Sequence, residues 1–110
     1  MPDEPVKVTA TAQAGGKVGI TWEKPANNGG STITQYVIEY KKSTPADAEW
    51  VVFDTVSATT RSVTVTGLVD GTKYTFGVAA QNADERSTRG TSEATADATG
   101  PTIVGVTSAL

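Results

Sequence analysis

The sequence contains no cysteine and no histidine among its 110 residues. Without cysteine it has no disulfide framework, no thiolate metal site and no cysteine nucleophile. Without histidine it lacks the commonest general base and the commonest metal ligand, and a Ser-His-Asp triad is excluded. Catalysis would have to come from carboxylates, lysines, tyrosines or hydroxyls, so a binding or structural module is the starting hypothesis.

Positive charge and long apolar runs are also scarce. Nine Lys and Arg against twelve Asp and Glu give a net charge of −3, whereas a nucleic-acid binder is expected to carry a basic stripe. No apolar run reaches the roughly 18 residues of a membrane helix. The first four residues lack the basic and apolar regions of a signal peptide. The sequence therefore predicts no nucleic-acid partner and no membrane insertion, and it indicates either an intracellular start or a fragment that begins at Met1.

What the chain does have is valine, threonine and glycine in patterns of period two. Stiff β-branched side chains suit a pleated surface, and alternation of apolar and polar residues indicates strands. Seven such segments are separated by turn signals, at residues 6–12, 18–22, 33–42, 50–53, 62–66, 74–81 and 91–99. No segment shows a helical period, so the predicted fold is all-β, a seven-stranded antiparallel sandwich of two sheets, immunoglobulin-like in architecture.

The phase of the alternation predicts which side chains face the core. The first strand should bury its alternating apolar residues from Val6 onward. The largest inward-facing residues of the later strands are Trp22, Tyr36, Ile38, Tyr74, Phe76 and Val78. Ile33 is out of phase with this set, which predicts a bulge near Thr34. Trp50 and Phe53 lie in a segment that is apolar on both faces, so packing at a sheet edge and an exposed contact surface both remain open.

Short motifs occur in a fixed order along most of the chain. Pro5 precedes the first strand, and Trp22 is followed by Pro25. The further motifs are Gly29–Tyr40, Val65–Leu68, Gly71-Thr72, Tyr74–Phe76, Val78–Ala80 and Asn82. In this order and spacing the chain resembles a fibronectin type III domain over about residues 5–99. Residues 1–4 are then a short lead. Residues 100–110 are a tail that opens a following module, pairs with a partner or folds back.

The resemblance implies a non-catalytic module without a cofactor. Such domains serve as spacers and as docking or adhesion modules, and their partners are proteins or neighbouring modules of a cell-surface or secreted protein. Seven antiparallel strands place the two ends of the domain at opposite poles, which suits a rod of tandem modules. The resemblance also implies a tyrosine corner at Leu68 and Tyr74, in which the hydroxyl of the tyrosine bonds the backbone a few residues upstream. Leu68 thereby joins the predicted core.

Three polar loops are expected at the pole where the domain begins, at residues 24–31, 54–60 and 82–90, which corresponds to the binding edge of antibody domains. The candidate binding residues are Asn27, Asn28, Asp84, Glu85, Arg86 and Arg89. Some family members carry Arg-Gly-Asp in the third loop and bind integrins. Here Gly90 is followed by Thr91, so that recognition does not carry over. A protein or a carbohydrate ligand remains open, and the alternative function is a stand-alone binding module displayed on a virus or phage surface.

The acidic residues show no strong catalytic or metal-binding pattern. Glu23 and Glu39 are expected on outward phases of neighbouring strands, with no sign of a cleft that would pair them as acid and base. Asp84-Glu85, or Asp47 with Glu49, would offer oxygen ligands but lack the spaced run of acids of a strong calcium site. Lys41-Lys42 is interpreted as a solvent-facing pair that discourages edge-to-edge association of sheets.

Overall fold

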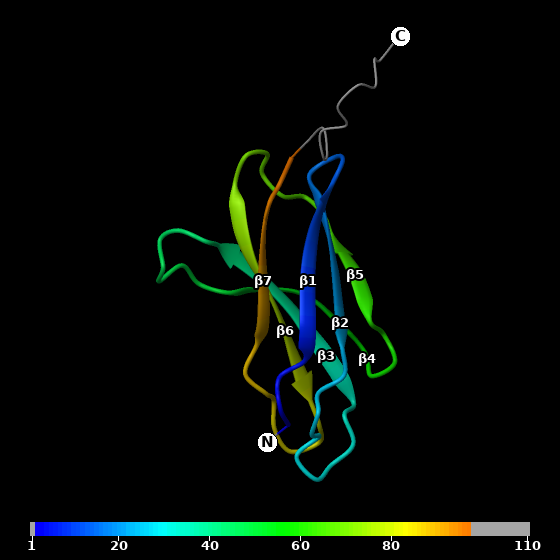
Figure 1. The fold of residues 1–110 in the computed structure, drawn as a ribbon. Helices are drawn as coiled ribbons and strands as arrows, with labels where there is room; N and C mark the ends of the chain where they lie inside the picture. The colour runs from blue at the N-terminus through cyan, green and yellow to red at the C-terminus, as the bar shows by residue number, and fades with distance from the viewer. Residues whose placement is uncertain (1, 98–110) are drawn as a thin grey trace.

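The computed structural model describes residues 2–97, which form two packed antiparallel sheets. The strands are β1 (Val6–Gln13), β2 (Lys17–Glu23), β3 (Gln35–Lys42), β4 (Val51–Ser57), β5 (Ser62–Val65), β6 (Lys73–Gln81) and β7 (Gly90–Thr95). One sheet has the order β1-β2-β5 and the other β4-β3-β6-β7 (Figure 1). The predicted all-β sandwich is thereby confirmed. Within the described residues no helix is long and apolar enough to cross a membrane.

The core lies between the two sheets and is built from side chains that alternate along the strands. Val18, Ile20 and Trp22 of β2 are all buried, as the alternation predicts. Trp22 faces Tyr36 of the opposite sheet, with ring centroids 5.6 Å apart. Fully buried neighbours from β3 and β6 include Ile38, Phe76 and Val78, and the partly buried Leu68 packs against the same cluster. Burial of these large apolar side chains supplies the main driving force for folding.

Strands β3 and β6 are covered on both of their faces. Val37 and Glu39, expected on the outward face of β3, are both buried, and so is Ala79 of β6. The alternation places these residues correctly on the outer face, but that face is not open to solvent here. A cover formed by Trp50 and Arg89 lies over it, as described below.

Strand β4 is longer than the sequence predicts. Residues 54–57 were expected to be loop, yet they pair with β3, where Val37 is opposite Thr55 and Gln35 is opposite Ser57. The irregularity of this sheet also lies in β4 rather than near Thr34, because the register shifts between Ile38 and Glu39. An edge strand such as β4 exposes much of its length, so its polar residues resemble a loop in sequence.

The start of β1 departs from the expected alternation. Val6 is 39% exposed, although the pattern predicts that it points into the core. The register between β1 and β2 shifts between Val6 and Thr9, and Lys7 has a positive φ of 55°. This irregularity turns Val6 out of phase with Val8 and Ala10, which do pack against the core.

Lys41 and Lys42 end β3 at positions that pair with β6 alone, because the pairing of β3 with β4 stops at Tyr40 opposite Val51. Their interpretation as guards against edge pairing stays a prediction. The Lys41 Nζ donates to the Ala46 carbonyl at 3.1 Å and lies 5.1 Å from the ring centroid of Trp50.

A hydrogen bond ties the Tyr74 hydroxyl to the connection before β6. The Val69 backbone N–H donates to the Tyr74 Oη at 3.0 Å, so the hydroxyl accepts rather than donates in this bond. The ring of Tyr74 is buried and lies 5.9 Å from that of Tyr40. The corner therefore fixes the loop that crosses from one sheet to the other.

Substitution of Tyr74 with phenylalanine is expected to cost about 1 kcal/mol of unfolding free energy, because the Val69 N–H loses its acceptor. Urea denaturation of both proteins measures the difference. Amide exchange at Val69 should accelerate in the variant more than exchange within β6. Unchanged stability together with unchanged exchange would show that this bond contributes nothing.

The chain enters the sandwich at one pole and completes its last strand at the other. In Figure 1 the N-terminal lead lies at the lower end, and β7 runs to the upper end. There the Gly71 N–H donates to the Ala96 carbonyl at 2.7 Å, and the Gly16 N–H donates to the Asp97 carbonyl. The expected tail at residues 100–110, including the three arrangements considered for it, lies outside the described residues.

Candidate functional site

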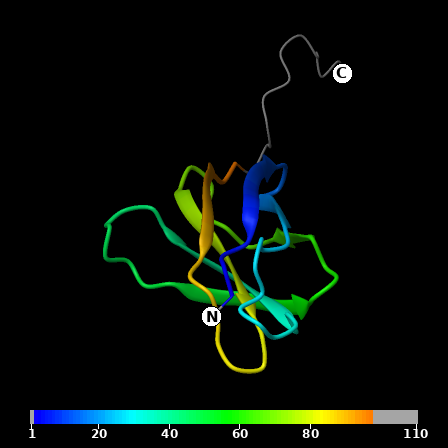
Figure 2. The same cartoon turned by 60° about the horizontal axis from the view of Figure 1, so that its bottom comes forward.

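Three connections meet at the pole where the chain begins. They join β2 to β3, β4 to β5 and β6 to β7, and Figure 2 turns this pole toward the viewer. The loops predicted at residues 24–31 and 82–90 are both present. The predicted loop at residues 54–60 shrinks to the short turn after Ser57, since β4 extends to that residue.

Asn82 joins two of these loops. It is only 3% exposed. Its Nδ2 donates to the Asn28 carbonyl at 3.0 Å, while its Oδ1 accepts from the backbone N–H groups of Asp84 and Glu85 at 2.8 and 2.7 Å. Every polar atom of the side chain is thus used to hold backbone, which makes Asn82 a positioning residue. The sequence suggested no such role, although Asn before a polar stretch is a known signal for this kind of turn.

Replacing Asn82 with alanine is expected to cost about 2 kcal/mol, because one buried side chain supplies three hydrogen bonds. Exchange of the Asp84 and Glu85 amides should also accelerate. Asn27→Ala is the matched control, since that side chain is exposed and its Oδ1 accepts one bond, from the Gly29 N–H within its own turn. A loss for Asn82→Ala no larger than for the control would contradict the role assigned to Asn82.

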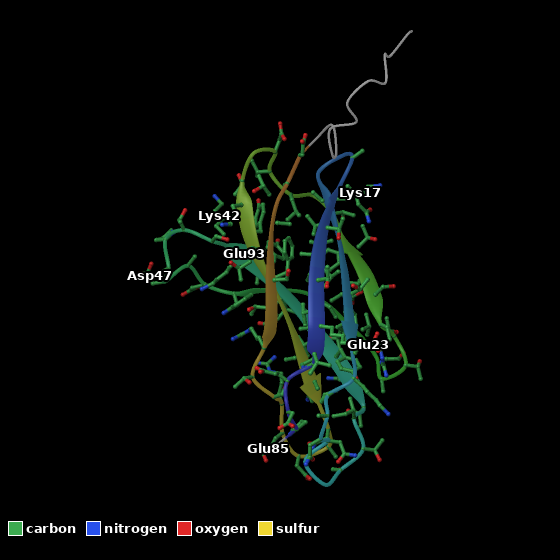
Figure 3. The ribbon with its side chains drawn as sticks, viewed as in Figure 1. Lys17, Glu23, Lys42, Asp47, Glu85 and Glu93 are labelled. Carbon is green, nitrogen blue, oxygen red and sulfur yellow. The ribbon has the colours of Figure 1, made fainter. Side chains whose placement is uncertain are left out.

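The candidate binding residues at this pole differ in whether their polar side-chain atoms are free to contact a ligand. Asn27 and Asn28 are exposed, but their side-chain oxygens accept from Gly29 and Gly30, so they shape the loop. Asp84, Glu85 and Arg86 are exposed at the tip of the third loop. Figure 3 shows Glu85 projecting away from the body of the domain at this end.

The side chain of Arg89, unlike those of the other candidates, is held by residues outside the loops of this pole. Its Nε and Nη2 donate to the Glu39 Oε1 and Oε2 at 2.9 and 3.1 Å, a bidentate pair. Its guanidinium carbon lies 4.4 Å from the centroid of the Trp50 ring. These contacts cover the outer face of the four-stranded sheet, so Arg89 contributes there rather than to a recognition loop. The Trp50 ring is in contact with two cations, those of Arg89 and Lys41.

The two carboxylates considered for catalysis do not meet. Glu23 is on β2 of one sheet and Glu39 is on β3 of the other, so the expectation of neighbouring strands is wrong. Glu39 is also occupied by Arg89. Across residues 2–97 no group of three or more Asp and Glu side chains could hold a metal ion.

A groove lies between the β2–β3 loop and the β4–β5 turn, with a volume of about 460 Å³. Its apolar lining includes Pro25, Ile33 and Ala58, and its charged lining residues are Lys24 and Arg61. The sequence predicts a loop at residues 54–60 but no individual binding residue within it. Arg61 follows that loop and carries no local signal that would have singled it out.

Arg61 is held in place at the side of this groove. Its Nη1 donates to the Ala58 and Thr60 carbonyls at 2.7 and 3.0 Å. Its guanidinium carbon lies 5.4 Å from the centroid of the Tyr36 ring. Burial raises the pKa of the Tyr36 hydroxyl above its ordinary value, and the Arg61 charge offsets part of that rise. Tyr36 is therefore uncharged near neutral pH and serves as part of the wall.

Comparison with known proteins gives a consistent result. The family model of the fibronectin type III domain matches residues 3–95. Titin of Drosophila melanogaster is 35% identical over 81 residues, and the human cell adhesion molecule DSCAM is 32% identical over 81 residues; both matches cover 74% of this chain. They take up 0% and 4% of those proteins to the nearest percent, so the chain spans less than a tenth of the length of these relatives.

Solved structures show the same fold. The twitchin kinase region of C. elegans superposes with a TM-score of 0.80 at 22% identity, covering 94% of this chain and 18% of that one. The FN5 domain of Drosophila Lar superposes with a TM-score of 0.70 at 26% identity, covering 88% of this chain and 98% of that one. None of the relatives named here supports the alternative of display on a virus or phage. The chain belongs to the fibronectin type III domain family.

Proposed function

We propose that the chain is a non-catalytic connecting module of a larger cell-surface or secreted protein. The observation that carries this proposal is the position of its ends, since β1 begins at one pole and β7 finishes at the other (Figure 1). A module of this kind adds its length to a row of modules without folding the row back on itself. The chain matches only a small share of each relative, and DSCAM is a cell adhesion molecule; both facts support the same function.

Small-angle X-ray scattering on one, two and three full-length copies joined end to end tests the connecting role. The maximum dimension should rise by a nearly constant increment with each copy. Each added copy should also unfold in urea at the midpoint of the single chain, because modules in a row keep separate cores. Side-by-side collapse of the copies, seen as a maximum dimension that stops growing, would contradict the proposal.

A further inference from the structure

The groove between the β2–β3 loop and the β4–β5 turn has charged residues of one sign only. Lys24 and Arg61 line it and no Asp or Glu does, although the net charge of the chain is −3. Three other hollows of the surface differ from it. One is lined by the acidic residues Asp3 and Glu4. The other two carry charges of both signs, namely Glu4, Lys7 and Arg89 in one and Lys41, Lys42 and Glu49 in the other. A cationic groove on an otherwise acidic domain is electrostatically complementary to an anionic partner.

Arg61 is arranged so that one edge of its guanidinium remains available. Its two hydrogen bonds within the turn both use Nη1. The Nε–H and the Nη2–H groups form no hydrogen bond within residues 2–97. These two nitrogens carry parallel donors, and this pair of donors binds a carboxylate in a bidentate manner. Because the turn and the Tyr36 ring already hold the side chain, binding costs little further side-chain entropy.

Lys24 and the apolar walls complete the recognition chemistry. Lys24 is exposed and forms no ion pair with a described residue. Ile33 and Ala58, both half-buried, provide apolar surface beside the two cations. The Tyr36 ring has Arg61 near it at 5.4 Å and Trp22 at 5.6 Å. It is also buried, so it offers no open aromatic face on which a sugar ring could stack.

We propose that this groove binds an acidic segment of a protein partner. An Asp or Glu carboxylate of the partner pairs with Arg61 and Lys24, while an adjacent apolar side chain packs against the half-buried Ile33 and Ala58. Apolar walls beside paired cations favour such a peptide over a sialylated glycan, which also carries a carboxylate. This inference goes beyond the connecting role, and its failure leaves that role standing.

Titration of the ¹⁵N-labelled full chain with defined probes tests the proposal by NMR. The first probe is acetyl-Gly-Leu-Glu-Asp-Leu-Gly-amide, and the second is the same peptide with Gln and Asn in place of the two acids. The acidic peptide should shift the signals of Lys24, Ala58 and Arg61, and it should bind at least about tenfold tighter than the neutral one because the charges across the contact are complementary. Added salt should weaken it, since the groove is open to solvent. The third probe, 3′-sialyllactose, should bind no tighter than the neutral peptide.

Charge-removing variants locate the contact. Lys24→Gln and Arg61→Gln should each weaken the acidic peptide by about fivefold, as expected for one partly exposed charge pair. Lys17→Gln makes the same charge change at the first residue of β2, at the opposite pole (Figure 3), and should leave affinity unchanged. Arg61→Gln also removes two bonds of the turn, so Lys24→Gln provides the test that is independent of folding. Equal affinity for both peptides, preference for 3′-sialyllactose, shifts confined to other residues or no binding at all would each overturn the proposal.

Discussion

Replacement of Trp22 with alanine is expected to lower the free energy of unfolding by about 3–5 kcal/mol, the range for removing a large aromatic side chain from a core. Trp22 is 1% exposed and packs against Tyr36 across the two sheets. Truncation leaves a cavity at the place where the sheets are held together by their two largest side chains. Urea denaturation followed by circular dichroism measures the loss. Val52→Ala is the control, because Val52 is 55% exposed and should cost about 0.5 kcal/mol or less.

Trp22→Phe separates packing from hydrogen bonding at the same position. The Trp22 Nε1 has no hydrogen-bond partner among the described residues, so phenylalanine removes no bond and relieves an unpaired buried donor. The loss should be less than half that of the alanine variant, and this variant remains measurable if Trp22→Ala does not fold. A loss of less than about 1 kcal/mol for Trp22→Ala would mean that Trp22 is not a central element of the core.

Strand β2 could be predicted fully from sequence because only one of its faces is buried. Val18, Ile20 and Trp22 point inward while Gly19, Thr21 and Glu23 between them are more exposed, so the period of two is clean. In β6 the inward residues Tyr74, Phe76 and Val78 are also buried as predicted, although that strand is covered on both faces. These strands, together with the turn signals between them, were enough to predict the sandwich.

Strands β3 and β4 show where the alternation stops being informative. β3 is central and covered on both faces, so the burial of Val37 and Glu39 depends on what lies above the sheet rather than on their own sequence. β4 is an edge strand, and its pairing with β3 through Asp54 to Ser57 is a long-range contact without a local apolar pattern. Propensity alone therefore assigned its second half to a loop.

The sequence predicts that three loops lie at the pole where the chain begins, but it does not predict the roles of the individual residues there. Asn82 and Arg61 act through backbone groups brought near by the fold, which a linear pattern does not contain. The cover of Trp50 and Arg89 did leave one signal, the glycine at position 77 in the middle of β6. A Cβ there would lie 2.9 Å from the Arg89 Cδ and 3.1 Å from the Trp50 ring. Glycine inside a strand marks such close approach.

The cover that Trp50 and Arg89 form on the four-stranded sheet is expected to contribute strongly to the stability of the domain. Arg89→Leu is expected to destabilise the domain by about 2–4 kcal/mol, because it leaves the Glu39 carboxylate buried without its partner. The Glu39 side chain is 5% exposed and that of Arg89 is 31% exposed, which places the expected loss at the lower part of the range for buried pairs. The stacking of the guanidinium on Trp50 is lost in the same variant. Thermal and urea denaturation both measure the change.

A double variant distinguishes the cost of the unpaired charge from the loss of packing. Glu39→Leu together with Arg89→Leu removes both charges, so the double variant should be more stable than Arg89→Leu alone. The exposed pair Lys73 and Glu93 supplies the control, with a distance of 3.4 Å and side chains 58% and 49% exposed. Replacing Lys73 with Gln should produce no measurable shift in the urea midpoint, since water and salt already screen that pair. If the double variant were as unstable as Arg89→Leu, the Glu39 charge would not be the origin of the loss. The guanidinium would then act on this sheet through its contact with Trp50 alone.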